Sequence, residues 1–289
     1  MTAAETYSTL VDAVNAQHAR QRGRQPQGDA WAGLEARRFR YDPRRNLEAN
    51  LEIIASYVQP EDTVVDVGGG AGRVSLPLAL RCRQVIDVEP SPGMRAEFES
   101  LVREAGIRNA QLIPADWLAV EGIQGDVAIT CSVTYFVRDI VPFIEKLQAA
   151  ARRRVMITVW SVPNPNQNAR LFQLVYDEEQ KPLPGHRELL PVLWEMGILP
   201  DVRVLPASPV VPGLQREGLP QTEEEAVQLA LQGQWLRSED RTRARSVIQT
   251  HFHQLFAAGS EGFHPLWRQD ARELLITWET RHDADGWRL

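Results

Sequence analysis

The sequence predicts an α/β protein built on a doubly wound, mainly parallel sheet, with a helical extension before the sheet and a helical insertion near its end. Short apolar runs alternate with helical patterns between residues 63 and 160. The run at 127–132 is almost continuously apolar, as in a strand covered by helices on both faces. A glycine cluster, residues 68–72, joins the first run to the first helical pattern.

Bulk composition is that of a globular protein and points away from polyanions and membranes. The chain has 289 residues, 43% hydrophobic and 24% charged, with a formal net charge of −6 and a pI near 5.6. This charge gives no global attraction to DNA or RNA, so nucleic acid is an unlikely partner. No stretch approaches the run of about 18 apolar residues that a membrane span requires, so we expect no insertion.

Two features point to the cytoplasm. The only cysteines, Cys82 and Cys131, stand in apolar surroundings, where reduced thiols are expected rather than a disulfide. Residues 1–17 lack the basic start and apolar core of an export signal.

The first half of the chain supplies most of the expected elements. Residues 1–45 are polar and helix-prone, are broken by Gly and Pro at 23–29, and read as an appendage, followed by a helix at 46–57. Strands are expected at 63–67, 84–88, 111–113, 127–132 and 155–160, and helices at 73–80, 94–105 and 140–151.

The second half is less regular. A helix is expected at 188–196 and late strands at 202–205 and 273–277, with a polar, helix-prone block at 222–256 between them. This block reads as an inserted cap. The expected domains are an N-terminal helical extension (1–62), a core (63–211 with 265–289) and a helical cap (212–264).

The strongest chemical signal is Asp66-Val67-Gly68-Gly69-Gly70-Ala71-Gly72, directly after an apolar strand and before an apolar-periodic helix. Gly68, Gly70 and Gly72 permit positive φ and close approach of a ligand, and the following helix offers free N–H groups. We expect an anionic or strongly polar ligand here; the alternative is a tight turn without one.

A second signal is the acid at the end of the next strand. Glu89 follows the glycine cluster by about 20 residues, the spacing at which an acid accepts hydrogen bonds from ribose hydroxyls in nucleotide-binding α/β folds. Asp87 is a weaker candidate because it falls inside the strand. The alternative for Glu89 is an exposed strand end.

Through DVGGGAG at 66–72 and VEPSPGM at 88–94, the sequence resembles the class I S-adenosylmethionine-dependent methyltransferases over about residues 63–160. The resemblance implies a Rossmann-like, seven-stranded sheet, transferase activity and S-adenosylmethionine as the cofactor. The loop departs from the dinucleotide fingerprint G-x-G-x-x-G, because Arg73 stands where the third glycine would be. That departure favours the methyl donor over NAD.

The resemblance also implies residue roles. Asp66 and the loop backbone would line the methionine and ribose portion, Glu89 would bind both ribose hydroxyls, and Pro90 and Met94 would flank adenine. Asp116 would bind the adenine amino group with Trp117 stacked nearby; the alternatives are an N-cap and core packing. The expected cofactor-binding set is Asp66, Gly68, Gly69, Gly70, Gly72, Glu89, Pro90, Met94, Asp116, Trp117 and Ser132.

Cys131, Ser132, Val133 and Tyr135 follow the fourth strand and should face the methyl group. The amino methyltransferases of adenine and cytosine resemble one another in an N/D-P-P-Y/F motif here. This chain has Ser132-Val133-Thr134-Tyr135 instead, which disfavours nucleobase amino methylation.

No catalytic base stands out, and methyl transfer from a sulfonium can rely on alignment and desolvation alone. Tyr135, Asp139, His251 and His253 are candidates, each with a structural alternative: Asp139 can cap a helix and Tyr135 can pack over the cofactor. His251 and His253, two residues apart on an expected helix, point to different faces, so no metal site is expected.

An aromatic and basic cluster, Trp31, Arg37, Arg38, Arg40 and Tyr41, precedes the core. Similar segments of the resembled family close over the cofactor; a solvated helix face is the equal alternative.

The expected function is methyl transfer to a small-molecule acceptor enclosed by a lid made of the N-terminal segment and the insertion. The acceptor atom (O, N or C) and the oligomeric state are left open by the sequence. The alternatives are an NAD(P)-dependent oxidoreductase and a non-catalytic protein that binds S-adenosylmethionine for regulation.

Overall fold

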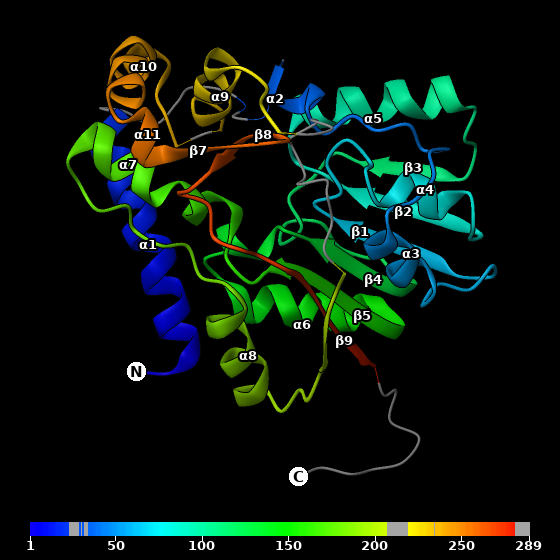
Figure 1. The fold of residues 1–289 in the computed structure, drawn as a ribbon. Helices are drawn as coiled ribbons and strands as arrows, with labels where there is room; N and C mark the ends of the chain where they lie inside the picture. Colours follow the sequence, from blue (N-terminus) through cyan, green and yellow to red (C-terminus); the bar gives the residue numbers. More distant parts are fainter. Residues whose placement is uncertain (23–28, 30, 32–33, 207–218, 234, 281–289) are drawn as a thin grey trace.

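A seven-stranded sheet forms the centre of the molecule (Figure 1). The computed structural model describes residues 1–22, 29, 31, 34–206, 219–233 and 235–280. The sheet order is β3-β2-β1-β4-β5-β9-β6. The strands are β1 Thr63–Val67, β2 Gln84–Val88, β3 Ala110–Ile113, β4 Gly125–Cys131, β5 Ala151–Trp160, β6 Asp201–Val204 and β9 Glu273–Glu279.

The strand order reverses between β1 and β4, which places a ligand crevice at their carboxyl ends. β1 pairs in parallel with both β2 and β4, and β4 with β5. The chain runs outward through β2 and β3 and then returns to the other side of β1. Open α/β sheets bind ligands at such a switch point. Only β9 runs opposite to the other strands of the sheet, so the predicted mainly parallel, doubly wound sheet is confirmed.

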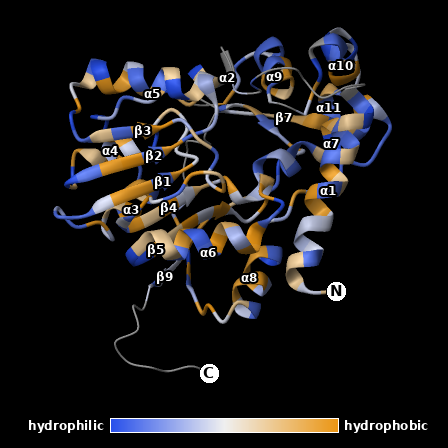
Figure 2. Cartoon of the chain, turned by 180° about the vertical axis from the view of Figure 1, so that it is seen from behind, coloured by the Kyte–Doolittle hydropathy of each residue, from blue (hydrophilic) through white to orange (hydrophobic). Residues whose placement is uncertain are grey.

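Helices cover both faces of the sheet. On one face, α3 (Ala49–Ala55), α4 (Ser75–Ala79) and α5 (Pro92–Ala105) pack on the strands. On the other lie α1 (Ala3–Arg22), α6 (Ile140–Ala150) and α8 (His186–Glu195). Figure 2 shows the hydrophobic residues concentrated on the central strands, as expected for strands enclosed on both faces.

The expectation that the N-terminal segment is an appendage is wrong for α1. Tyr7, on α1, is fully buried, and its hydroxyl donates to the carbonyl oxygen of Thr134 at 2.7 Å. Val11 and Val14 follow one turn apart and join the same core cluster, against α6 and α8. The helix therefore belongs to the core, although its polar composition concealed this.

A group of helices, here called the cap, lies beside the sheet (Figure 1). Its helices are α7 (Ala169–Tyr176), α9 (Glu223–Ala230), α10 (Arg241–Thr250) and α11 (Phe252–Leu255), and they share one apolar cluster. Two parts were not predicted: α7, and a hairpin of β7 (Phe256–Gly259) and β8 (Gly262–Pro265). These strands are short and lack a clear period-two pattern. Residues 212–218 of the expected cap lie outside the described residues.

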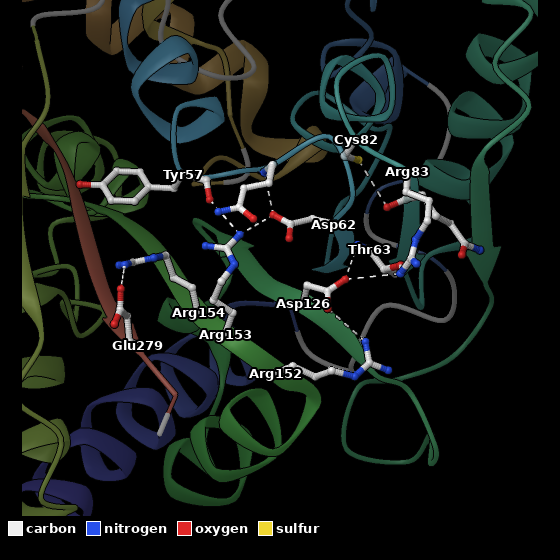
Figure 3. A network of polar contacts seen from close by, with 12 residues as sticks. Tyr57, Asp62, Thr63, Cys82, Arg83, Asp126, Arg152, Arg153, Arg154 and Glu279 are labelled. Atoms are coloured by element: carbon white, nitrogen blue, oxygen red, sulfur yellow. Dashed lines mark hydrogen bonds and ion pairs between the residues drawn. The ribbon is translucent and has the colours of Figure 1, made fainter. Parts of the chain in front are cut away.

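The amino end of β5 shows why the sequence predicted this strand too short. Arg152, Arg153 and Arg154 interrupt the apolar pattern, yet all three belong to the strand. They lie at the amino end of β5, opposite the carboxyl ends that border the ligand crevice. Figure 3 shows each paired with an acid: Arg152 with Asp126, Arg153 with Asp62 and Arg154 with Glu279. This basic cluster is neutralised within the fold.

Two shorter helices, α2 (Leu34–Arg37) and the 3₁₀ turn η1 (Thr134–Phe136), lie near the carboxyl ends of the strands; further 3₁₀ turns are η2 (Asn164–Asn168) and η3 (Ser238–Asp240). Within the described ranges, no helix combines the length and the apolar character needed to cross a bilayer.

Candidate active site

The glycine loop leaves β1 and turns back toward α4 in a conformation that requires its glycines. Gly68, Gly70 and Gly72 have φ of +71°, +63° and +83°, in the left-handed region that favours glycine. A Cβ on Gly72 would lie 2.5 Å from Leu76, whereas one on Gly70 would have Met94 Sδ as its nearest neighbour, at 3.6 Å. Packing fills the space beside Gly72 and leaves more room at Gly70.

Gly69 is a glycine for a different reason. Its φ is not in the left-handed region. A Cβ there would lie 2.1 Å from Oδ2 of Asp87 and 2.7 Å from Oδ2 of Asp66. Two buried carboxyl groups therefore lie directly against the loop, which the sequence did not predict for Asp87.

Glu89 ends β2 beside the loop and is bonded to it. One carboxylate oxygen accepts from Gly70 N at 3.0 Å and the other from Ser91 N at 2.7 Å. The side chain is buried, so the alternative of an exposed strand end does not hold here. Burial raises the pKa of Glu89, and the two N–H donors oppose that shift. This carboxylate is preorganised at the position expected for a ribose-binding acid.

The N-terminal segment lies over the loop and α5. Ala36 packs with Ala71 and Met94, and Trp31 and Phe39 join this cluster with their rings 5.5 Å apart. Met94 is buried, whereas Pro90 is exposed.

Ion pairs hold the same segment to the outer side of α5. Arg40 pairs with Glu97 at 2.9 Å and with Glu104, and Arg37 pairs with Glu97 at 3.7 Å. Tyr41 carries Arg45 above its ring, 5.0 Å from the centroid. Arg37 and Arg40 thus tie the segment to α5.

Asp29 accepts hydrogen bonds from the start of α5. The sequence did not single it out. Its Oδ2 accepts from Ser91 Oγ at 2.8 Å and from Gly93 N at 2.7 Å. These bonds lower the pKa of Asp29 against the opposing effect of burial. A lone aspartate in a Gly- and Pro-rich stretch carries no signal of this tertiary contact.

Asp116 and Trp117 occupy the turn after β3, where no helix begins that Asp116 could cap. Asp116 is exposed, and its Oδ1 accepts from Leu118 N at 2.8 Å, which closes the turn. Trp117 is buried in the core, with Lys146 above its ring at 5.2 Å. Contact of either residue with adenine stays a prediction.

Ser132 follows β4 in a strained conformation. Its φ is +60°, unusual outside glycine, and its buried hydroxyl oxygen has no hydrogen-bond partner. Strain of this kind clusters at functional sites. Ser132 is therefore placed at the carboxyl edge of the sheet with a free hydroxyl.

The four candidate bases are not brought together. Tyr135 is buried, its hydroxyl accepts from Trp160 N at 2.5 Å, and burial raises its pKa, so it holds its proton. Asp139 occupies the N-cap of α6 without a capping bond and pairs with Arg138 at 3.0 Å. His251 and His253 lie in the cap, at the junction of α10 and α11. Tyr135 alone follows the end of β4.

Glu273 is a buried acid at the sheet edge that the sequence did not single out. It starts β9 opposite Trp160, and its Oε2 accepts from Asn50 Nδ2 at 2.8 Å. Oδ1 of Asn50 and Nε1 of Trp160 are buried without partners. Its place after an irregular stretch gave no sequence signal.

Among the described residues, no group of three or more His, Cys, Asp or Glu side chains is arranged to hold a metal ion.

Three features together define the class I methyltransferase fold, whose cofactor is S-adenosylmethionine: a parallel sheet whose strand order reverses between β1 and β4, the glycine loop, and the buried acid at the end of β2. A family model described as "Methyltransferase domain" matches residues 65–156, the segment from β1 through the middle of β5.

Two solved structures share this fold, and a curated relative matches part of the chain. The YcgJ protein of Bacillus subtilis superposes with a TM-score of 0.51 at 12% identity, over 81% of this chain and 98% of that one. A putative methyltransferase of Bacillus halodurans gives 0.52 at 10% identity, with the same coverage. A 23S rRNA (uracil-C5)-methyltransferase of Xanthomonas axonopodis is 36% identical over 76 residues, which are 25% of this chain and 17% of that protein. The match thus spans about a sixth of that relative.

Proposed function

We propose that this protein transfers the methyl group of S-adenosylmethionine to a small-molecule acceptor. The observation that carries the cofactor assignment is Glu89, a buried carboxylate tied to the N–H groups of Gly70 and Ser91. Both of its oxygens can accept from the two hydroxyls of a ribose, as in nucleotide-binding α/β folds. The donor set therefore fits a nucleoside.

The remaining cofactor contacts follow from the same placement. Met94 adjoins Gly70 and supplies an apolar surface for adenine, and Ser132 offers a free hydroxyl where the methionine end would lie. Asp66 and the loop backbone line that end in this proposal. S-Adenosylmethionine supplies an activated methyl group, so the chain's own residues have to align the acceptor and exclude water.

The acceptor would meet Tyr135, Trp160 and Glu273, which adjoin at the carboxyl ends of β4, β5 and the start of β9. Glu273 bears a carboxylate that can accept from an acceptor O–H or N–H. Tyr135, with its raised pKa, acts as a hydrogen-bond donor rather than a base. The cap helices α9, α10 and α11 and residues 34–41 would enclose this acceptor, which favours a small molecule.

Cytoplasmic location is part of the proposal. It is supported by the free Cys82 and Cys131, because reduced thiols are usual in that compartment.

A methyl-transfer assay with labelled S-adenosylmethionine tests the acceptor class. The protein would be incubated with a small-molecule extract and, separately, with total RNA. We expect label in the small-molecule fraction, and we expect Glu273→Gln to reduce that transfer without changing cofactor affinity. Label in RNA alone would replace the proposed acceptor with a nucleic acid, as for the Xanthomonas relative.

A further inference from the structure

Two aspartates lie side by side beneath the glycine loop. Asp66 on β1 and Asp87 on β2 are register partners in neighbouring parallel strands. Their exposed fractions are 1% and 0%. The Oδ2 atoms of both lie within 2.7 Å of the point where a Cβ of Gly69 would be, so the two carboxyl groups are neighbours.

These carboxyl groups lack enough donors for two negative charges. The Ser75 hydroxyl donates to Oδ2 of Asp87 at 3.0 Å. The hydroxyl and backbone N–H of Ser75 also favour the ionised form of Asp66, whereas Oδ1 of Asp87 has no hydrogen-bond partner, so Ser75 is the donor on which both carboxyl groups depend. Two ionised carboxylates in contact and away from water repel each other strongly, whereas one proton between them supplies a donor and removes a charge.

The charged groups around the two aspartates are of both signs. Glu89, at the end of β2, adds negative charge, and Arg73, before α4, opposes it at Asp66. Cys131 on β4 is kept as a neutral thiol because burial raises its pKa. Burial, followed by the repulsion of Asp66, raises the pKa of Asp87, and burial also raises that of Asp66.

We propose that Asp66 and Asp87 hold one shared proton in the free protein and release it when a cationic methyl donor binds at the glycine loop, so that the pair favours the donor over the neutral product. This inference rests on the proposed function, which places the donor at the loop. The released proton goes to the buffer, and the pair then carries two negative charges beside the bound cation.

Comparing the affinities of the methyl donor and its product separates the effect of the shared proton from binding in general. S-Adenosylmethionine and S-adenosylhomocysteine share the adenosine, the ammonium and the carboxylate, and they differ by the positive charge on sulfur and the methyl group. An added unit charge ~10 Å away, at an effective dielectric constant of ~20, changes the affinity for the sulfonium on the order of tenfold.

The first experiment measures the dissociation constants of both ligands by calorimetry between about pH 6 and about pH 8.5, around the range to which buried carboxyls can be raised. We expect the preference for S-adenosylmethionine over S-adenosylhomocysteine to grow with pH by about tenfold, from the charge estimate above. Asp87→Asn should remove this pH dependence, because the amide can donate to Asp66 but cannot ionise.

The second experiment counts protons by repeating the titrations near neutral pH in buffers of different ionisation enthalpy. The wild-type protein should release more protons with S-adenosylmethionine than with S-adenosylhomocysteine, and Asp87→Asn should release equal numbers. Equal release by the wild-type protein would overturn the inference, and this readout stands even if the variant does not fold. Absence of binding by both ligands would instead overturn the proposed function.

Discussion

At the scale of single residues, the glycine loop combines two requirements that look identical in the sequence. Gly70 and Gly72 need left-handed backbone, whereas Gly69 leaves room for two carboxyl groups. Sequence reasoning explained the first requirement from the motif. It could not find the second, because Asp87 is 18 positions away in the chain and reaches Gly69 only through strand pairing.

Gly69→Ala should therefore destabilise the protein by about 1–3 kcal/mol, the usual cost of overpacking. The new Cβ would lie 2.1 Å from Asp87 Oδ2. Combining it with Asp87→Ala should recover much of that loss in a double-mutant cycle measured by denaturant unfolding. Gly106→Ala is the control for the coupling: its cost comes from its left-handed φ of +62° alone, because it has no neighbour within 4 Å, so it should be additive with Asp87→Ala. Additive effects of the Gly69 and Asp87 substitutions would argue against their contact.

Other residues of the site were beyond prediction for the same reason. Asp29 reaches Ser91 and Gly93, and Asn50 reaches Glu273, only after the chain has folded. By contrast, Glu89 was predictable, because its spacing from the glycine loop follows from one β-α-β unit.

At the scale of elements, strands with apolar runs were predicted well even where one charge interrupts them, as in β1 and β2, whereas the three arginines that begin β5 were not assigned to it. The strands at 63–67 and 84–88 were predicted with the bounds that β1 and β2 have. The first residues of β5 were missed because Arg152, Arg153 and Arg154 find acidic partners across the sheet edge. The hairpin β7–β8 was missed because its short strands lack a clear period-two pattern.

The buried position of α1 gives a direct test. Tyr7→Ala should destabilise the protein by about 3–5 kcal/mol, as large-to-small substitutions of buried aromatic residues do. Tyr7→Phe, which loses only the bond to Thr134, should cost about 1 kcal/mol. The exposed Thr6→Ala serves as the control in the same thermal unfolding series. If Tyr7→Ala unfolded like the control, α1 would not be part of the core.

The apolar cluster of the cap can be destabilised by a substitution that leaves the cofactor site unchanged. Phe256 stacks on Phe252 at 4.8 Å and meets Trp267 edge-on at 4.9 Å. Phe256→Ala should increase hydrogen exchange in α10, α11 and the hairpin, because a cavity opens in the cap cluster. Affinity for S-adenosylmethionine should stay within about twofold, while acceptor turnover falls. Equal protection of the cap in both proteins would show that this cluster does not stabilise it.

At the scale of the whole molecule, buried carboxyl groups make stability depend on pH. The pKa values of Asp66, Asp87 and Glu89 are all raised, chiefly by burial. At these three groups the folded protein holds more protons than the unfolded chain above about pH 4, the ordinary range for these acids. The stability that these three groups contribute is fully present below that pH and is lost as pH rises through their raised pKa values.

The unfolding temperature of the free protein should consequently fall between about pH 5 and about pH 8. Asp87→Asn should raise it by about 2–4 °C per kcal/mol recovered at pH 8 and by less at pH 5. Scanning calorimetry at both values measures this. A larger gain at pH 5 than at pH 8 would contradict the raised pKa values.

The central claim, a nucleoside site for S-adenosylmethionine at the glycine loop, is tested most directly by calorimetric titration. S-Adenosylmethionine, S-adenosylhomocysteine and NADH would each be titrated into the wild-type protein, Glu89→Ala and the exposed control Glu99→Ala. The account predicts saturable binding of the first two ligands and none of NADH. It also predicts a loss of about 10- to 100-fold in Glu89→Ala, the scale of hydrogen bonds to a charged group, and no change in the control. Binding of NADH alone would contradict the account and favour an oxidoreductase.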